Sequence, residues 1–329
     1  MKKTLLALAV AAVSTSALAA GNIYDDGTTS FNVKGEIDTY LSTADVKTTK
    51  AGVTTKESAD PDVNLWAKIQ IDAKHKLNDS VTAFGSFEIE NGNGFDSWSG
   101  LTSDSNTTKT DDLYFGFNFG ENFGIAMGEI GDFGDSLDAI TIDNTNEGIG
   151  YMDDFAKSLE SAGHAVSAKY TTGGLKLIAD TYLTSDEDED VAYGASAQYA
   201  FSEMFTLGAT YQDQGNRGSE IMGVAARMNI AGFGAAVNYV LEDKVSGEEY
   251  SVVSTALDYQ IDKVRLYTSL GFAEDDNSDK EITYFTVGAD YAVSSNISAF
   301  IEYSDAEQET DSNNKVEGNG AVAGFYYTF

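Results

Sequence analysis

Carboxylates are the residues of this chain best suited to chemistry, and many of them fall in one long segment between Gly131 and Gly163. The segment includes Asp132, Asp135, Asp138, Asp143, Glu147, Asp153 and Asp154. Lys157 is the basic residue that opposes them in the same stretch. A segment with this charge concentrates cations wherever it borders water. Binding and steering of cations is therefore the first chemistry to consider.

Catalysis and metal chemistry have little support in the sequence. The chain has no cysteine, which excludes zinc–thiolate sites and cysteine nucleophiles. Its two histidines, His75 and His164, are far apart in the chain and have no companion ligands nearby. A histidine-based triad or metal site is not expected. We therefore expect no enzyme, no cofactor and no metal.

The charge and composition narrow the possible partners. The formal net charge is −33, so nucleic acid is excluded as a partner, because phosphate binding requires positive charge. Proline occurs once, at Pro61, and the chain is rich in glycine, tyrosine and phenylalanine. Few prolines and many aromatics suit long continuous strands. An exported chain without disulfides can be held together by a closed sheet.

Long alternating segments are the elements that must position the carboxylates. Apolar and polar residues alternate from Thr29 to Ser42 and again from Val63 to Leu77. The second run exceeds the usual strand of about five or six residues. Similar segments recur about sixteen times along the chain. The pattern predicts an all-β fold, a transmembrane antiparallel β-barrel with about sixteen strands.

The connections between these segments alternate in length. Short turns such as Asn78–Asp79 are followed by long acidic loops, expected at 43–62, 91–110, 131–163 and 304–316. In outer-membrane barrels the short turns face the periplasm and the long loops face outside. A soluble β-sandwich has no reason to sort its loops in this way. The loop pattern favours the barrel.

The two ends of the chain agree with export to a membrane. Lys2 and Lys3 precede a short apolar run, and Ala17 and Ala19 provide a cleavage site. We expect residues 1–19 to be a signal peptide and residues 20–329 to form the barrel. At the other end, Phe325, Tyr327 and Phe329 alternate along the last strand and share one face. An aromatic ending of this kind is typical of a closing barrel strand.

On these grounds the chain resembles the general porins of Gram-negative outer membranes, especially the vibrio-type porins. The resemblance rests on the leader, the series of strands and turns, the long loop 131–163 and the final Tyr-Tyr-Thr-Phe. It implies an outer-membrane homotrimer of sixteen-stranded barrels, with a third external loop folded into each pore. The implied function is passive diffusion of small hydrophilic solutes and ions. A saccharide-selective porin and a barrel that acts mainly as an adhesin or structural protein are the alternatives.

The resemblance gives the charged residues expected roles. The carboxylates of loop 131–163 would form the acidic side of a pore constriction, and basic residues of the barrel wall would face them. Strand parity places Lys34, Lys68, Lys74, Lys169 and Arg265 on that wall. The surplus of carboxylates predicts a preference for cations.

Aromatic residues and partners complete the expectations. Parity also turns Tyr40, Trp66 and Tyr114 inward, where they could stack on sugar rings or pack between the wall and the loop. The terminal aromatics Phe325, Tyr327 and Phe329 are expected to signal to the barrel-assembly machinery. Outer-membrane lipid and lipopolysaccharide are the other expected partners.

Overall fold

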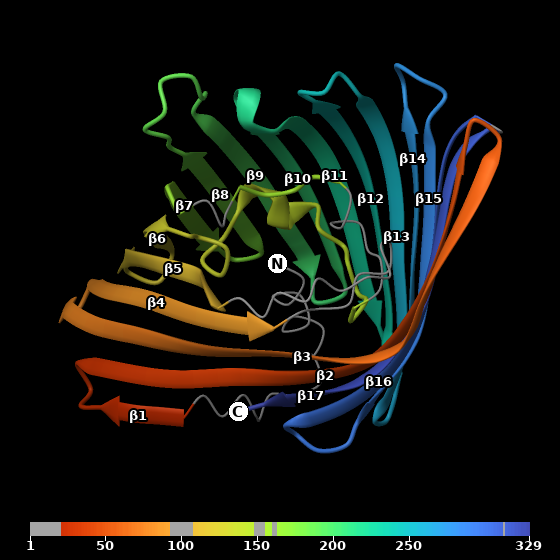
Figure 1. Ribbon diagram of the computed structural model, residues 1–329. Helices are drawn as coiled ribbons and strands as arrows, with labels where there is room; N and C mark the ends of the chain where they lie inside the picture. Colours follow the sequence, from red (N-terminus) through yellow and green to blue (C-terminus); the bar gives the residue numbers. More distant parts are fainter. Residues whose placement is uncertain (1–20, 93–107, 148–154, 160–162, 312) are drawn as a thin grey trace.

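The strands of this protein form one antiparallel sheet that closes on itself (Figure 1). The computed structural model describes residues 21–92, 108–147, 155–159, 163–311 and 313–329, and these contain seventeen strands. Two short 3₁₀ turns, η1 (Ser136–Ala139) and η4 (Gly215–Arg217), lie between strands of this part of the chain. None of the helical segments in the described ranges is long and apolar enough to cross a membrane.

Each strand pairs with the next one along the chain, so the sheet is an up-and-down meander. The strands are β1 (Gly21–Asp25), β2 (Thr29–Lys50), β3 (Val53–Asn78), β4 (Val81–Gly92), β5 (Thr108–Phe119), β6 (Phe123–Gly128), β7 (Ala165–Thr172), β8 (Leu175–Tyr182), β9 (Ala192–Ser202), β10 (Phe205–Asp213), β11 (Ser219–Ile230), β12 (Phe233–Lys244), β13 (Glu249–Ile261), β14 (Val264–Asp275), β15 (Glu281–Ala292), β16 (Ile297–Asp311) and β17 (Asn314–Thr328).

The barrel closes where the last strand meets the second. β17 pairs with the part of β2 from Glu36 to Thr49, and β1 pairs with the part of β2 from Ser30 to Val33. β1 therefore continues the line of β17 along β2. The seventeen strands of the described residues occupy sixteen positions, and the predicted antiparallel barrel of about sixteen strands is confirmed.

Side chains alternate between an apolar outer face and a largely polar inner face. Along β16 the exposed fraction is 60% for Ile301 and 40% for Tyr303, but 1% for both Glu302 and Ser304. This is the period of two of a β-strand, with apolar groups on the outside of the barrel and polar groups towards the lumen. Unlike those of a soluble protein, the large exposed apolar side chains of this sheet cover the outside of the barrel.

The long loop expected at 43–62 is not a loop, and that prediction was wrong. β2 continues to Lys50 and β3 begins at Val53, so only Ala51 and Gly52 form the turn. Both turn residues have positive φ, at 51° and 76°, as a tight hairpin requires. The polar composition of the segment suggested a loop. The segment is nevertheless rich in threonine, a β-branched residue that suits a sheet.

The prediction of a loop at 304–316 was wrong for the same reason. β16 runs to Asp311 and β17 begins at Asn314. The outer parts of β16, β17, β2 and β3 therefore extend together beyond neighbouring strands (Figure 1). Cross-strand ion pairs help to join them, including Lys47–Glu317 at 2.5 Å and Lys315–Glu307 at 2.8 Å. The charged residues of this segment suggested a loop, but they form pairs between neighbouring strands of the sheet.

Candidate functional site

The segment between β6 and β7, called here the inward loop (residues 129–164), folds into the barrel (Figure 1). Its described residues are 129–147, 155–159 and 163–164. The turn η1 contacts β8, β9 and β10 on the inner wall. A Cβ at Gly194 would lie 2.1 Å from Ser136 Oγ, and one at Gly208 would lie 2.1 Å from the carbonyl oxygen of Ala139. Glycine at these two wall positions lets the loop approach closely.

Asp135 is the N-cap of η1 and joins the beginning of this turn to the wall. Its carboxylate accepts hydrogen bonds from the backbone N–H of Leu137 at 2.5 Å and from the hydroxyls of Ser158 and Tyr182. The residue is 1% exposed. On β8, Asp180 accepts the N–H of Ser136 in the same way, at 2.5 Å. The structure therefore places Asp135 in the contact between loop and wall and away from the open lumen.

Arg227 of β11 holds the end of η1. Its guanidinium donates to the backbone carbonyls of Asp138 at 3.3 Å and Ala139 at 3.1 Å, and also to that of Thr141. Asn238 of β12 donates to the next carbonyl, that of Ile140, at 2.9 Å. The rigid fork of an arginine suits several acceptors at once. Arg227 was not among the predicted site residues, although parity along β11 could have turned it inward.

Arg265 of β14 docks the next part of the loop. It donates to the carbonyl of Asn144 and to Asn146 Oδ1, both at 3.2 Å, and it pairs with Asp290 at 2.6 Å. Arg265 is 6% exposed. Arg265 therefore lies on the wall, but its guanidinium is engaged by the inward loop and by Asp290.

Glu147 is held in a buried contact with the closing strands. Tyr326 of β17 donates to Glu147 Oε1 at 2.8 Å. Glu302 of β16 accepts the N–H of Asn146 at 2.5 Å and the N–H of Glu147 at 2.7 Å. Glu147 is 4% exposed. The loop is thus fixed to the wall from Asp135 to Glu147.

The predicted lysines differ in their surroundings. Lys34 lies 3.6 Å from Asp132 and 3.9 Å from Asp72, and Lys68 lies 2.8 Å from Glu88. Lys74 is exposed near the end of β3. The structure therefore brings Lys34 together with a loop carboxylate and pairs Lys68 with a carboxylate of the wall.

Two further lysines contact the inward loop. Lys169 donates to the carbonyl of Phe133 and lies over its ring at 4.3 Å, and Lys176 pairs with Asp138 at 3.1 Å. Asp143 is half-buried and accepts the hydroxyl of Thr145 at 2.7 Å. The predicted constriction residues Asp153 and Asp154 lie outside the described residues.

The three inward aromatics pack against other rings. Tyr40 contacts Phe300 and Tyr326 edge-on with centroids 6.3 Å apart, and Tyr114 lies 6.4 Å from Phe133 of the inward loop. Trp66 is 6% exposed and donates to Glu90 at 3.1 Å. The burial of Tyr40 and Trp66 and the contact of the half-buried Tyr114 with Phe133 favour the packing interpretation.

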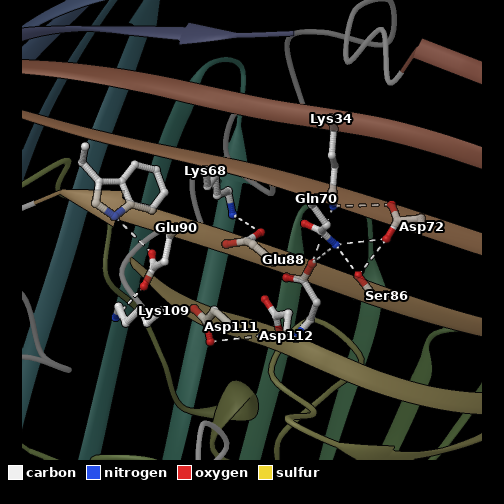
Figure 2. Close-up of polar contacts among 12 residues, drawn as sticks. Lys34, Lys68, Gln70, Asp72, Ser86, Glu88, Glu90, Lys109, Asp111 and Asp112 are labelled. Atoms are coloured by element: carbon white, nitrogen blue, oxygen red, sulfur yellow. Dashed lines mark hydrogen bonds and ion pairs between the residues drawn. The ribbon is translucent and has the colours of Figure 1, made fainter. Parts of the chain in front are cut away.

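Acidic residues on β4 and β5 form a group that was not predicted. Glu88, Glu90, Asp111 and Asp112 lie together on the inner wall, with Lys68 beside Glu88 and Lys109 beside Glu90 (Figure 2). The pairing of β4 with β5 is irregular between Ser86 and Glu88, and Asp112 has a φ of 51°. This bulge turns two consecutive aspartates inward, which strict alternation would not allow.

The bore described here is therefore polar and acidic. Lys34, Lys68, Lys169, Lys176, Arg227 and Arg265 all contact a carboxylate or a backbone carbonyl. Among the described residues, Asp111 and Asp112 have no lysine or arginine within ion-pair distance.

The chain is similar to known proteins in sequence. The model of a family described as Gram-negative porin matches residues 5–311. Porin-like protein L of Photobacterium profundum is 27% identical over 312 residues, which cover 84% of this chain and 83% of that protein.

Solved structures share the fold. The trimer form of in-vitro folded OmpT, an outer membrane protein of Vibrio cholerae, has a TM-score of 0.71 at 16% identity, with 92% of this chain and 100% of that chain covered. OmpF of Salmonella typhi in complex with daunomycin has a TM-score of 0.68 at 17% identity, with 94% and 100% covered.

Proposed function

Because this chain belongs to the Gram-negative porin family, we propose that it is a water-filled channel for passive diffusion of small hydrophilic solutes and ions that prefers cations over anions. Porins are channels of the outer membrane, and a closed barrel with a polar inner face suits that role. The inward loop narrows the lumen, and its docking to the wall gives the passage a fixed shape.

One observation carries the cation preference: the bases of the bore are engaged and the carboxylates are in surplus. Arg227 and Arg265 donate to loop carbonyls, so their charges are held within the contact between loop and wall. Asp111 and Asp112 add two negative groups to the opposite wall, with no base of the described residues paired to them. Fixed charges of one sign along a pore select mobile ions of the other sign.

The test is the reversal potential of the purified protein in a planar lipid bilayer that separates two KCl concentrations. A cation-preferring channel gives a reversal potential on the side of the potassium equilibrium potential. A reversal potential on the side of the chloride equilibrium potential would refute the cation preference, but the protein would still be a channel. Absence of conductance from correctly folded protein would refute the channel itself and favour an adhesin or structural role.

We also propose that the protein is a homotrimer embedded in outer-membrane lipid and lipopolysaccharide. The trimeric state of the similar OmpT structure supports this assembly. Phe325 is 56% exposed and Tyr327 44% on the outer face of β17, and Phe329, directly after the strand, is 38% exposed. These aromatics are accessible to lipid and to the barrel-assembly machinery. Migration as a heat-modifiable oligomer, and its loss when Phe329 is deleted, would support both points.

Export through a signal peptide completes the proposal. We infer that residues 1–19 are removed, so that the mature chain begins at Ala20. Ala20 would then lie directly before β1, which starts at Gly21. Sequencing the N-terminus of protein from purified outer membranes tests the cleavage site, and a start at Met1 would contradict it.

A further inference from the structure

Three strands place oxygen-bearing side chains in one row across the inner wall. In the strand register, Gln70 of β3 lies opposite Glu88 of β4, and Glu88 lies opposite Asp111 of β5. The bulge adds Asp112 to the end of the row. Gln70 is 1% exposed, Glu88 2% and Asp112 8%. The row is therefore a sheltered part of the wall (Figure 2).

The spacing of the carboxylates fits one calcium-sized ion. Glu88, Asp111 and Asp112 each offer one oxygen, and these oxygens all lie within 4.8 Å of one another. Calcium binds oxygen at about 2.3–2.6 Å, so ligands on opposite sides of the ion are about 5 Å apart. Magnesium binds at about 2.0–2.1 Å and demands a near-ideal octahedron. This spacing accommodates either ion, and the irregular set of ligands on a bulged wall favours calcium, whose coordination geometry is the more flexible.

Gln70 supplies a separate reason to expect a ligand. Its amide nitrogen donates to Ser86 at 2.7 Å and to Asp72 and Asp132 at 3.1 Å. Its Oε1 atom is buried and has no hydrogen-bond partner among the described residues. Because the nitrogen faces these three groups, the oxygen turns the other way, towards the side of Glu88 (Figure 2). An unsatisfied buried oxygen is costly, and an amide oxygen is a good calcium ligand.

Charge balance points in the same direction. Lys68 neutralises Glu88 at 2.8 Å, and Lys109 is engaged with Glu90. Asp111 and Asp112 have no such partner in the described part of the wall. Like charges held this close together repel one another, and a shared proton or a bound cation relieves the repulsion. A divalent ion would balance the charges of the two aspartates, and Lys68 would remain paired with Oε2 of Glu88.

We propose that Glu88, Asp111, Asp112 and the amide oxygen of Gln70 form a calcium site on the lumen wall. Asp112 also accepts the backbone N–H of Asp132 at 2.8 Å, so the ion would lie beside the first residues of the inward loop. Calcium would thus stiffen the junction between β5 and this loop. The proposal rests on the wall geometry and does not require the proposed ion selectivity. A bound ion would offset the charges of Asp111 and Asp112, so the selectivity is measured with a calcium chelator present.

The test is terbium luminescence of the full mature protein in detergent, with excitation of tryptophan. Terbium takes the same oxygen ligands as calcium, and Trp66 donates to Glu90, two residues from Glu88, so energy transfer is expected. We expect saturable luminescence that calcium displaces and that magnesium displaces more weakly. The variant D111N/D112N should bind terbium at least about tenfold more weakly, since removal of even an outer-shell partner costs this much.

A matched control removes two carboxylates elsewhere. Asp79 and Asp262 lie exposed in the short turns between β3 and β4 and between β13 and β14, and D79N/D262N should bind as the wild type does. If the double variant fails to fold, D111N alone is measured, because asparagine can still accept the N–H of Asp112. Equal binding by the folded variant and the wild type, or no saturable binding by the wild type, would overturn the proposal. Neither result depends on conductance.

Discussion

Phe329 and Gly35 exchange two backbone hydrogen bonds: the N–H of Phe329 donates to Gly35 at 2.9 Å, and the N–H of Gly35 donates to Phe329 at 2.8 Å. The terminal residue thereby completes the seam between β17 and β2. A Cβ at Gly35 would lie 2.3 Å from the ring of Phe329 and 2.8 Å from the carbonyl oxygen of Lys68. The seam requires a residue without a side chain at this position.

Gly35→Val should therefore destabilise the closed barrel. Overpacking of a fitted site costs about 1–3 kcal/mol, and here the ring of Phe329 must also move. We expect a lower temperature for loss of the folded form on gels and for loss of β signal in circular dichroism. Gly21→Val is the control, because a Cβ there would meet nothing within 4 Å. Equal stability of the two variants would contradict the role given to the seam.

Arg227→Lys should loosen the inward loop without removing a charge. The single ammonium group of a lysine cannot replace the guanidinium, which donates hydrogen bonds to the carbonyls of Asp138, Ala139 and Thr141. Hydrogen bonds to charged groups are worth about 1.5–3 kcal/mol each. We expect larger fluctuations of the open-channel current.

The matched control for this variant is Arg217→Lys. Arg217 also donates to backbone carbonyls, at 3.2 Å to Leu183, but it lies in the turn between β10 and β11. Its current should remain as steady as that of the wild type. If the open-channel current of Arg227→Lys is as steady as that of the wild type, the inward loop does not depend on the guanidinium of Arg227.

Two external turns should separate at low pH. Lys280 donates to Glu248 at 2.8 Å, and this hydrogen bond lowers the pKa of the Glu248 carboxyl below its ordinary value of 4.5. A lowered pKa means that the contact stabilises the fold above pH 4.5 and is lost as pH falls through the lowered value. Glu248→Gln should therefore be less stable than the wild type at neutral pH and equal to it in acid. Thermal unfolding at neutral pH and in acid measures the difference in stability between Glu248→Gln and the wild type. A difference that persists in acid would argue against a stabilising role of the Glu248–Lys280 contact.

The contact between η1 and the wall can be captured covalently. The chain has no cysteine, so a disulfide can form only between introduced residues. A Cβ at Gly194 would lie 3.0 Å from the Cβ of Ser136 and 2.5 Å from Asp180 Oδ1. Disulfides have Cβ atoms about 3.5–4.5 Å apart, so the bond forms once the loop shifts slightly away from the wall. S136C/G194C should cross-link on oxidation and shift in mobility without reductant. A folded protein whose thiols stay free would place the loop elsewhere.

The sequence predicted most of the barrel because alternation is a local property. Ile301 and Tyr303 alternate with Glu302 and Ser304, and the structure places them on opposite faces. The prediction failed where polar strands extend beyond the apolar band, as in the parts of β2 and β3 on either side of the turn Ala51–Gly52. Charged and threonine-rich segments look like loops when their cross-strand partners are unknown.

The site was harder to predict because it depends on register. Glu88 and Asp111 are far apart in sequence and meet only through the pairing of β4 with β5. The inward turn of Asp112 depends on a bulge, which parity cannot anticipate. Asp135 was expected on a pore surface from its charge, whereas its burial depends on Tyr182 and Ser158, which lie distant in the chain.

The central claim is that the acidic wall beside the inward loop makes the channel prefer cations. The most direct measurement is the reversal potential of D111N/D112N in a KCl gradient with a calcium chelator present, beside the wild type and D79N/D262N. We predict a cation-side potential for the wild type and the control, and a clear shift towards zero for D111N/D112N. An unchanged potential in that variant, or a chloride-side potential in the wild type, would contradict the account.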